Sequence, residues 1–265
     1  MIRNIIAFLA LILFSSNTIY AQDRFYLDEN IIEIDSIEFQ KKCKIYILKC
    51  LTYKTDSVEV NKVLYNFKFG KLSPIEYQQI KKALIQKSKK HIDDDAVLLV
   101  NYRDSLYNFE IRKKSYDVHI QKHNDIKHHE FTLETFDKSR KKWISKQQKC
   151  SSKIDKKFNT ATFYVYNFDY GSIEHYPDLG WIKDRGFFKN IFFQIYGNYR
   201  YLVIKPDGEY FLCGSYFSDS NLKYLLKNKD WTKIKSDFKK SYVSESPFGI
   251  GRFKKKYYNQ LEHCF

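Results

Sequence analysis

Residues that break regular structure are scarce in this chain, which has 9 glycines and 4 prolines among 265 residues. This scarcity excludes collagen-like chains and low-complexity chains rich in proline and glycine. The chain also holds 22 phenylalanines and 22 tyrosines, and 43% of its residues are hydrophobic. So many large apolar side chains exclude an intrinsically disordered protein. We expect a compact protein with one domain, or one domain with a sizeable extension.

No two cysteines have the spacing CxxC, which excludes a zinc ribbon and the usual dithiol redox site. The cysteines are odd in number, so in an oxidising compartment at least one is unpaired, buried or intermolecular. They are Cys43, Cys50, Cys150, Cys213 and Cys264. The apolar pattern from Cys43 to Cys50 is typical of one strand, and seven residues of strand span roughly 23 Å. We therefore expect no bridge between these two cysteines unless a turn intervenes.

The first apolar run is too short for a membrane anchor. Arg3 precedes the apolar residues 5–14, and small and polar residues follow as far as Ala21. A membrane-spanning helix needs roughly 17 to 25 apolar residues. The pattern therefore predicts a secretory signal peptide at residues 1–21 and a secreted or periplasmic bacterial protein. We expect no transmembrane segment after the signal peptide is removed.

Acidic residues are too few to balance the basic ones. Cleavage after Ala21 leaves 45 Lys and Arg against 31 Asp and Glu, a formal charge of +14. This charge favours anionic partners, such as components of the cell envelope, polysaccharide or nucleic acid. The basic residues are spread along the whole chain, and no nucleic-acid-binding motif is recognisable. We therefore expect no sequence-specific binding of nucleic acid.

Alternating or continuous apolar residues predict strands in several stretches. These stretches are 30–39, 45–53, 96–100, 161–167, 201–205 and 209–213. The last two flank the turn Pro206-Asp207-Gly208, which predicts a hairpin.

The clearest helix begins after Ser73, which precedes Pro74 and stands three residues before Glu76, the order of a capping box. Other starts have weaker signals. They are Asp56 for a short helix, Thr132 or Thr135 for a helix carrying Phe136, Trp143 and Ile144, residues 177–194 for a broken helix, and residues 218–220 for a final helix with a second helical segment after it.

From Ala96 onward the expected order is strand, helix, strand, helix, strand, tight turn, strand, helix, and this order resembles the thioredoxin-like fold. The hairpin and the helix after it (YLVIKPDGEYFLCGSYFSDSNLKYLL) look like the C-terminal half of that family. The resemblance covers roughly residues 92–240 and implies an α/β protein with a mixed four-stranded sheet and flanking helices. We expect this domain at residues 91–265, including a basic C-terminal tail. Residues 22–90 would form an N-terminal α+β extension that packs on the domain.

The resemblance also implies a redox site that this sequence lacks. Enzymes of the family carry a reactive cysteine pair just after the first strand, and the matching residues 101–105 contain no cysteine. They also carry a cis-proline just before the third strand, and the matching residues 197–200 contain no proline. We therefore expect a non-redox scaffold kept for binding or scaffolding in the cell envelope.

The candidate binding residues are Tyr102, Arg103, Asp104 and Arg200. Ligands of α/β sheets bind beyond the carboxyl ends of the strands, and the apolar run 96–100 ends just before the first three. Arg200 would approach the same end in the resembled fold. As an alternative, the adjacent Arg103 and Asp104 could pair with each other as a structural lock.

Two other functions stay open. One is a thiol-dependent oxidoreductase that uses a single cysteine, either Cys150 or Cys213. The other is polyanion binding by the basic surface, which would weaken steeply with added salt. Residues 119–130 hold the densest set of possible metal ligands, but a solvated polar loop is the better interpretation of this biased stretch. No motif indicates a cofactor.

Overall fold

The computed structural model describes residues 23–122, 130–171, 173, 179–193, 200–214 and 219–255. The expected signal peptide, residues 1–21, lies outside the described residues.

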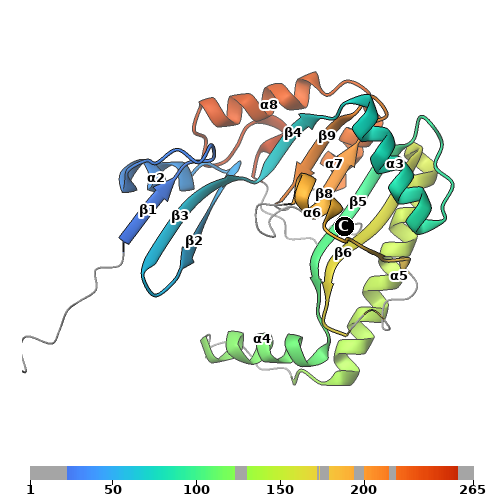
Figure 1. Ribbon diagram of the computed structural model, residues 1–265, viewed down its shortest axis with the longest axis horizontal. Coiled ribbons are helices and arrows are strands. Elements are labelled where there is room, and N and C mark those ends of the chain that lie inside the picture. Colours follow the sequence, from blue (N-terminus) through green and yellow to red (C-terminus); the bar gives the residue numbers. More distant parts are fainter. Residues whose placement is uncertain are drawn as a thin grey trace, which may run out of the picture.

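Within the described residues, the strands form two sheets, and helices surround the larger one (Figure 1). The protein is therefore a mixed α/β protein. The larger sheet has six strands in the order β4-β9-β8-β5-β6-β7. Their bounds are β4 (Phe67–Lys71), β5 (Val97–Leu106), β6 (Thr160–Asp169), β7 (Ile182–Lys183), β8 (Tyr201–Ile204) and β9 (Glu209–Cys213).

The smaller sheet has the order β1-β3-β2. Its strands are β1 (Asp23–Leu27), β2 (Leu48–Lys54) and β3 (Val58–Tyr65). The helices are α2 (Ser36–Cys43), α3 (Pro74–Ser88), α4 (Phe109–Lys122), α5 (Leu133–Phe158), α6 (Phe187–Phe192), α7 (Asp219–Lys227) and α8 (Thr232–Val243), with a 3-10 turn, η3 (Gly251–Phe253), near the end.

The stretches that begin at Ala96, Ala161, Tyr201 and Glu209 lie side by side in the larger sheet, as the sequence predicts. β5 pairs with β6 in parallel, and β8 runs antiparallel to both β5 and β9. The expected sheet of four strands is nevertheless too small. β4 pairs with β9 at one edge and β7 pairs with β6 at the other.

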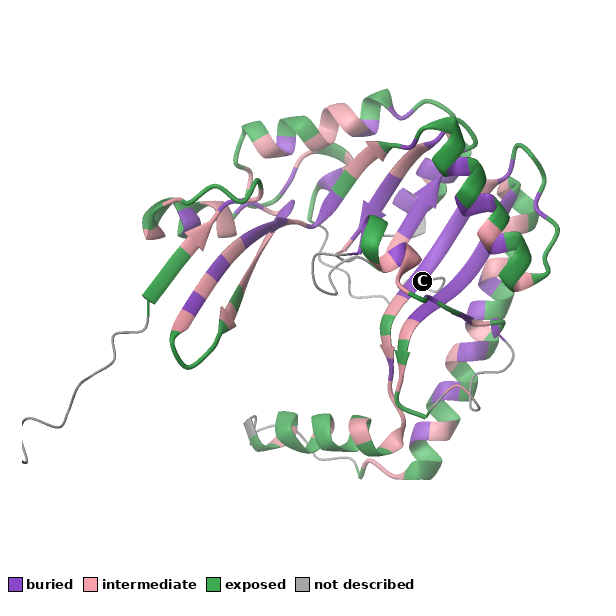
Figure 2. Cartoon of the chain, viewed as in Figure 1, coloured by how far each residue is buried: buried purple, intermediate pink, exposed green. Residues whose placement is uncertain are grey.

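Helices cover both faces of the larger sheet. Leu98 and Val100 of β5 pack with residues of α3 and α6 on one face. Leu99, between them, packs with residues of α5 and α7 on the other face. This alternation follows from the pleat of a strand, in which successive side chains point to opposite faces. Figure 2 shows that the buried residues are concentrated in the middle of this sheet.

Residues 67–88, which the sequence assigns to the extension, contribute β4 and α3 to the larger sheet and its core. The predicted capping box at the start of α3 is confirmed. The Ser73 hydroxyl accepts a hydrogen bond from the Glu76 backbone N–H, and the Glu76 carboxylate accepts one from the Ser73 backbone N–H.

The elements before β4 differ from the prediction. Residues 36–43 form a helix rather than part of a strand, because the Asp35 carboxylate caps them by accepting hydrogen bonds from Ile37 N and Glu38 N, both at 2.8 Å. Residues 58–65 form β3 rather than a helix that starts at Asp56, because they pair with β2 along its full length. The valines of this segment suit a strand, and its pairing with β2 and with β1 decides between the two patterns.

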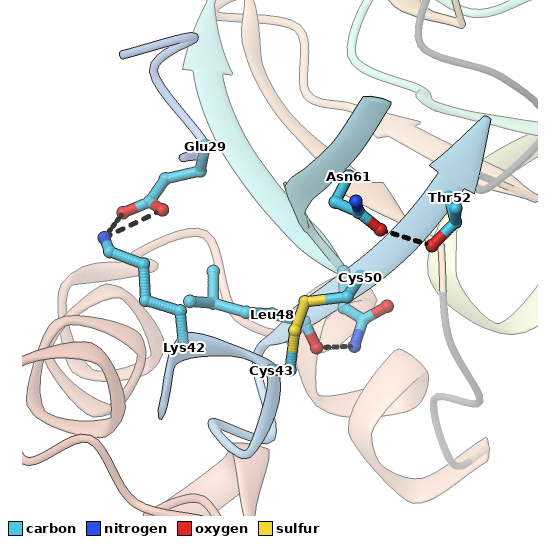
Figure 3. The surroundings of a disulfide bond; sticks show 8 residues. Glu29, Lys42, Cys43, Leu48, Cys50, Thr52 and Asn61 are labelled. Carbon is cyan, nitrogen blue, oxygen red and sulfur yellow. Dashed lines mark hydrogen bonds and ion pairs between the residues drawn. A yellow bond between two sulfur atoms is a disulfide. The ribbon is translucent and has the colours of Figure 1, made fainter. Parts of the chain in front are cut away.

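Cys43 and Cys50 form a disulfide, so the expectation of a single strand between them is wrong (Figure 3). α2 ends at Cys43, and β2 begins only at Leu48. Between them the chain turns, with Leu48 N donating to Ile45 O at 3.0 Å. The turn brings the Cα atoms of the two cysteines to 5.5 Å, within the range that a disulfide requires.

A buried carboxylate, that of Glu29, ties the region of the small sheet to α8. The Glu29 carboxylate is fully buried and accepts hydrogen bonds from Lys42 Nζ at 2.8 and 3.0 Å (Figure 3). It also accepts a hydrogen bond from the hydroxyl of Tyr242 in α8. This bond to Glu29, together with burial, raises the pKa of Tyr242 to about 12. A buried carboxylate with two partners joins segments that are 213 residues apart in the chain.

The turn Pro206-Asp207-Gly208 joins β8 to β9 as predicted and also contacts Leu72, two residues before α3. Glu209 N donates to the Asp207 carboxylate at 2.9 Å, and Gly208 adopts a φ of +83°. Leu72 N donates to Gly208 O at 2.9 Å. A Cβ at position 208 would lie 2.5 Å from the Leu72 carbonyl oxygen. Glycine is therefore required there by conformation and by space.

We predict that Gly208→Ala lowers the free energy of unfolding by more than about 2 kcal/mol, because left-handed strain of roughly 1–2 kcal/mol adds to the clash with Leu72. Gly171→Ala is the matched control. Gly171 has a φ of +80°, but no atom lies within 4 Å of the added Cβ. Urea denaturation measures both variants. Equal losses in the two variants would contradict the close approach at Leu72.

Candidate functional site

Pairing between β5 and β8 brings the predicted site residues together. Asn101 stands opposite Tyr201, and one residue further on Tyr102 N donates to Arg200 O at 2.8 Å. Arg200 therefore lies beside Tyr102, as the resemblance implies. The first strand does not end at Val100 as expected. β5 continues to Leu106 because its parallel partner β6 continues beside it.

All four predicted residues contribute to the lining of one cavity of about 640 Å³. We call it the arginine–aromatic cavity. Its walls come from the end of β5, from α4 and α5, and from the residues just before β7 and β8. The described residues that line it are Tyr102, Arg103, Asp104, Ser105, Leu106, Tyr107, Arg112, Phe131, Phe136, Ser139, Arg140, Trp143, Trp181 and Arg200.

The pleat of β5 divides the three consecutive candidates between the two faces of the sheet. Arg103 faces α5, where its guanidinium lies 5.7 Å from the ring centre of Trp143. Tyr102 and Asp104 make their side-chain contacts with α6 and the residues beside it. The Asp104 carboxylate lies 3.5 Å from Lys189 Nζ of α6. Because Arg103 and Asp104 point to opposite faces of the sheet, their positions do not favour the alternative in which the two side chains pair with each other as a structural lock.

Tyr102 holds α6 on the sheet. Its ring stacks on Phe193 with ring centres 3.9 Å apart, and its hydroxyl donates to the Asp184 carboxylate at 3.4 Å. The same carboxylate accepts hydrogen bonds from the backbone N–H groups of Phe188 and Lys189 at the start of α6. Burial, reinforced by the nearby Asp184 charge, raises the pKa of Tyr102. Tyr102 therefore stays protonated and acts as a positioning residue.

Arginines stacked on aromatic rings characterise the cavity. Besides Arg103 on Trp143, Arg112 lies 5.0 Å from the ring centre of Tyr107, and Arg140 lies 4.5 Å from that of Phe136. A stacked guanidinium is attracted by the ring face and keeps its N–H donors arranged around its edge. Such groups bind carboxylate and phosphate oxygens.

The cavity carries an excess of positive charge. The described lining has one acidic residue, Asp104, which pairs with Lys189, and four arginines, which are Arg103, Arg112, Arg140 and Arg200. Arg140 is almost fully buried and pairs with Asp137 of α5 at 2.8 Å. Arg112 and Arg200 are exposed, and neither forms an ion pair with a described acidic side chain. The electrostatics suit an anionic ligand.

Sequence reasoning missed Arg112, Arg140 and Trp181. For Arg140 a signal existed, because it stands four residues after Phe136 on the helix face predicted from Phe136 and Trp143. Arg112 lies in α4, a helix that the sequence analysis did not predict. No sequence signal could have joined Trp181 to these residues, because only the tertiary fold brings it to the cavity.

Metal ligands do not gather within the part of the chain that the structure describes, where no three His, Cys, Asp or Glu side chains could hold one ion. His119 is exposed on α4. The remaining histidines of the biased stretch, His123, His128 and His129, lie outside the described residues.

The structure places the two candidate nucleophiles, Cys150 and Cys213, in different environments. Cys150 is disulfide-bonded. Cys213 is not disulfide-bonded, but it is 1% exposed and packs in the core beside β9. Neither residue lines the arginine–aromatic cavity. Cys264 lies outside the described residues.

No protein-family model matches the chain, and comparisons with curated proteins and with solved structures found no match. None of the described helices is long and apolar enough to cross a bilayer.

We predict that Cys213 does not react fast in the native, non-reduced protein, because its thiol is buried and reacts only after unfolding. Titration with Ellman's reagent before and after denaturation measures how many thiols react and how fast. Cys213→Ala should abolish the slow reaction that Cys213 contributes. A thiol that reacts within seconds in the folded wild type, and disappears in Cys213→Ala, would contradict this prediction and favour the single-cysteine enzyme.

Proposed function

We propose that this protein is an exported, non-redox binding module of the thioredoxin-like type, and that it binds an anionic ligand in the arginine–aromatic cavity. The observation that carries the proposal is the convergence of Arg103, Arg112, Arg140 and Arg200 on one cavity lined with aromatic rings.

The arrangement of the larger sheet supports the thioredoxin-like interpretation. Its four adjacent strands, β9-β8-β5-β6, belong to two units on which the resemblance rests. In the first unit helices connect β5 to β6, and in the second a turn connects β8 to β9 and α7 follows. The cavity also joins the two segments that match the family's redox site. Residues 102–105 are in its wall, and so is Arg200, which immediately precedes β8. A fold does not imply a chemistry, so the function is argued from these residues.

The thiols support a binding role over the single-cysteine oxidoreductase. That alternative needs a reactive Cys150 or Cys213 at the site. Cys150 is in a disulfide, and Cys213 is buried away from the cavity. The arginines supply charge and hydrogen-bond donors, but no nucleophile.

The disulfides support export. Cys43 and Cys50 are joined, and Cys150 is also disulfide-bonded. Disulfides form and persist mainly in secreted and periplasmic proteins. This agrees with the signal peptide expected at residues 1–21 and favours a ligand in the cell envelope or outside it.

The lining of the cavity indicates the chemistry of the ligand. Arginine forms charge-assisted hydrogen bonds to carboxylate or phosphate oxygens, often two at once. Trp181, a half-buried residue of the same wall, offers apolar ring surface. A ligand that combines an anionic group with a flat apolar part therefore fits better than a bare ion. Phenyl phosphate has this combination and serves as the probe.

We predict that phenyl phosphate binds in the arginine–aromatic cavity and that Arg103→Gln and Arg200→Gln each weaken the affinity five- to tenfold. A hydrogen bond to a charged group contributes about 1.5–3 kcal/mol when buried, and less at the exposed Arg200. Backbone amide NMR titration measures the affinity. The matched control is Arg185→Gln, which removes an exposed arginine that does not line the cavity. Unchanged affinity in both cavity variants, or an equal loss in Arg185→Gln, would refute the site.

A further inference from the structure

A second cavity lies at the opposite end of β5. Its volume is about 1020 Å³, and its lining includes Val97, the first residue of β5. Arg103 of the arginine–aromatic cavity is six residues further along the strand, roughly 20 Å away. Figure 1 shows α5 running along the sheet from the α4 end to this other end. The walls come from the end of α5, the turn between β8 and β9, α7 with the residues after it, and η3. We call it the lysine cavity.

Basic side chains from three separate segments converge on the lysine cavity. The ones that are exposed or half-buried are Lys156, Lys157, Lys223, Lys227, Lys229 and Arg252. None of these six forms an ion pair with another residue that the structure describes. A seventh, Lys205, is buried and neutralised, because it pairs with Asp207 at 3.3 Å and with Glu209 at 2.5 Å.

The two acidic residues of the described lining, Asp95 and Asp207, offset only a small part of this charge. Asp207 is held by Lys205, and Asp95 accepts a hydrogen bond from Asn159 Nδ2 at 2.8 Å. A concave wall of like charges concentrates the field and attracts anions from solution.

A purely structural role explains only part of this cluster. Lys156, Lys157 and Lys227 stand in the last turns of α5 and α7, where cations complement the helix dipole. Lys223 stands earlier in α7, four residues before Lys227, and like charges at this spacing repel each other on a helix. Lys229 and Arg252 are outside both helices. The folded chain therefore brings together charges that oppose folding and that an anionic ligand would neutralise.

The aromatic rings of the lysine cavity distinguish between classes of polyanion. Arg252 covers Tyr224, with its guanidinium 4.1 Å from the ring centre, and Lys157 Nζ lies 5.6 Å from the ring centre of Phe158. Proteins that bind single-stranded nucleic acid stack bases on open aromatic faces. Here the rings are occupied by cations, which favours a polyanion without bases.

The size of the cavity and its residue types favour a chain over a single anion. A volume of about 1020 Å³ is at the upper end of pockets that hold whole small molecules, which run roughly 300–1,000 Å³. Lysine ammonium groups are flexible point charges that tolerate variable anion positions, unlike the fixed fork of arginine. We propose that the lysine cavity binds an anionic polysaccharide, with successive charged groups of the chain paired to these lysines.

The test uses a heparin decasaccharide as the probe, with its affinity measured by calorimetry on the full chain at 50 and 200 mM salt. The triple variant Lys223→Gln, Lys227→Gln, Lys229→Gln should weaken binding at 50 mM salt at least tenfold and make the affinity less dependent on salt. The matched control removes three exposed lysines outside the cavity, as Lys82→Gln, Lys113→Gln, Lys239→Gln. The control should change the affinity less than threefold, although its net charge is the same.

Several outcomes would overturn the proposal. Equal losses of affinity in the two triple variants would indicate diffuse attraction. No binding of the decasaccharide at 50 mM salt would also refute the site, and so would tighter binding of single-stranded DNA of equal charge. If the cavity triple does not fold, Lys156→Gln with Lys157→Gln replaces it, with at least a threefold loss expected and an unchanged affinity refuting the site. Phenyl phosphate binding by the same variants stays unchanged, so failure here is distinguishable from failure of the arginine–aromatic cavity.

Discussion

The structure depends on the backbone pairing of β5 with β6 on one side and β8 on the other. Leu98, Leu99 and Val100 of β5 have no exposed surface, because both neighbouring strands and the helices on both faces cover them. The hydrogen bond from Tyr102 N to Arg200 O extends the pairing with β8 and sets Arg200 at the end of the sheet. A slip of one residue in this register would exchange the two faces of the strand and turn Arg103 away from α5.

The sequence predicted the elements whose signals are local. The continuous apolar run at 96–100, the capping box at Ser73 and the turn before Gly208 each depend on a few adjacent residues, and the structure contains all three. The N-terminal elements failed because their signals were ambiguous without partners. Residues 58–65 are a strand because they pair with β1 and β2, and the bridge between Cys43 and Cys50 requires a turn that the apolar pattern did not reveal.

In the candidate site, too, residues with a local sequence signal could be predicted, and residues that depend on the tertiary fold could not. Arg103 could be placed because it comes soon after the apolar run 96–100, and Arg200 because it immediately precedes a predicted strand. Arg112 lines the cavity from α4, and Trp181 lines it from the segment before β7. The residues next to each of them in the sequence give no indication of this. The two cavities also differ in a way that composition alone could not reveal. Among the described residues, the arginine–aromatic cavity is lined by four arginines and no lysine, whereas the lysine cavity is lined mainly by lysines, so a uniformly basic sequence forms two cavities with different linings.

A crystal structure of the protein grown with phenyl phosphate tests the central claim most directly. The account predicts that β5 and β8 pair with Tyr102 N bonded to Arg200 O, and that the phosphate lies against the guanidinium groups of Arg103 and Arg200. A different register that separates these two arginines, or an anion bound only outside the arginine–aromatic cavity, would contradict it.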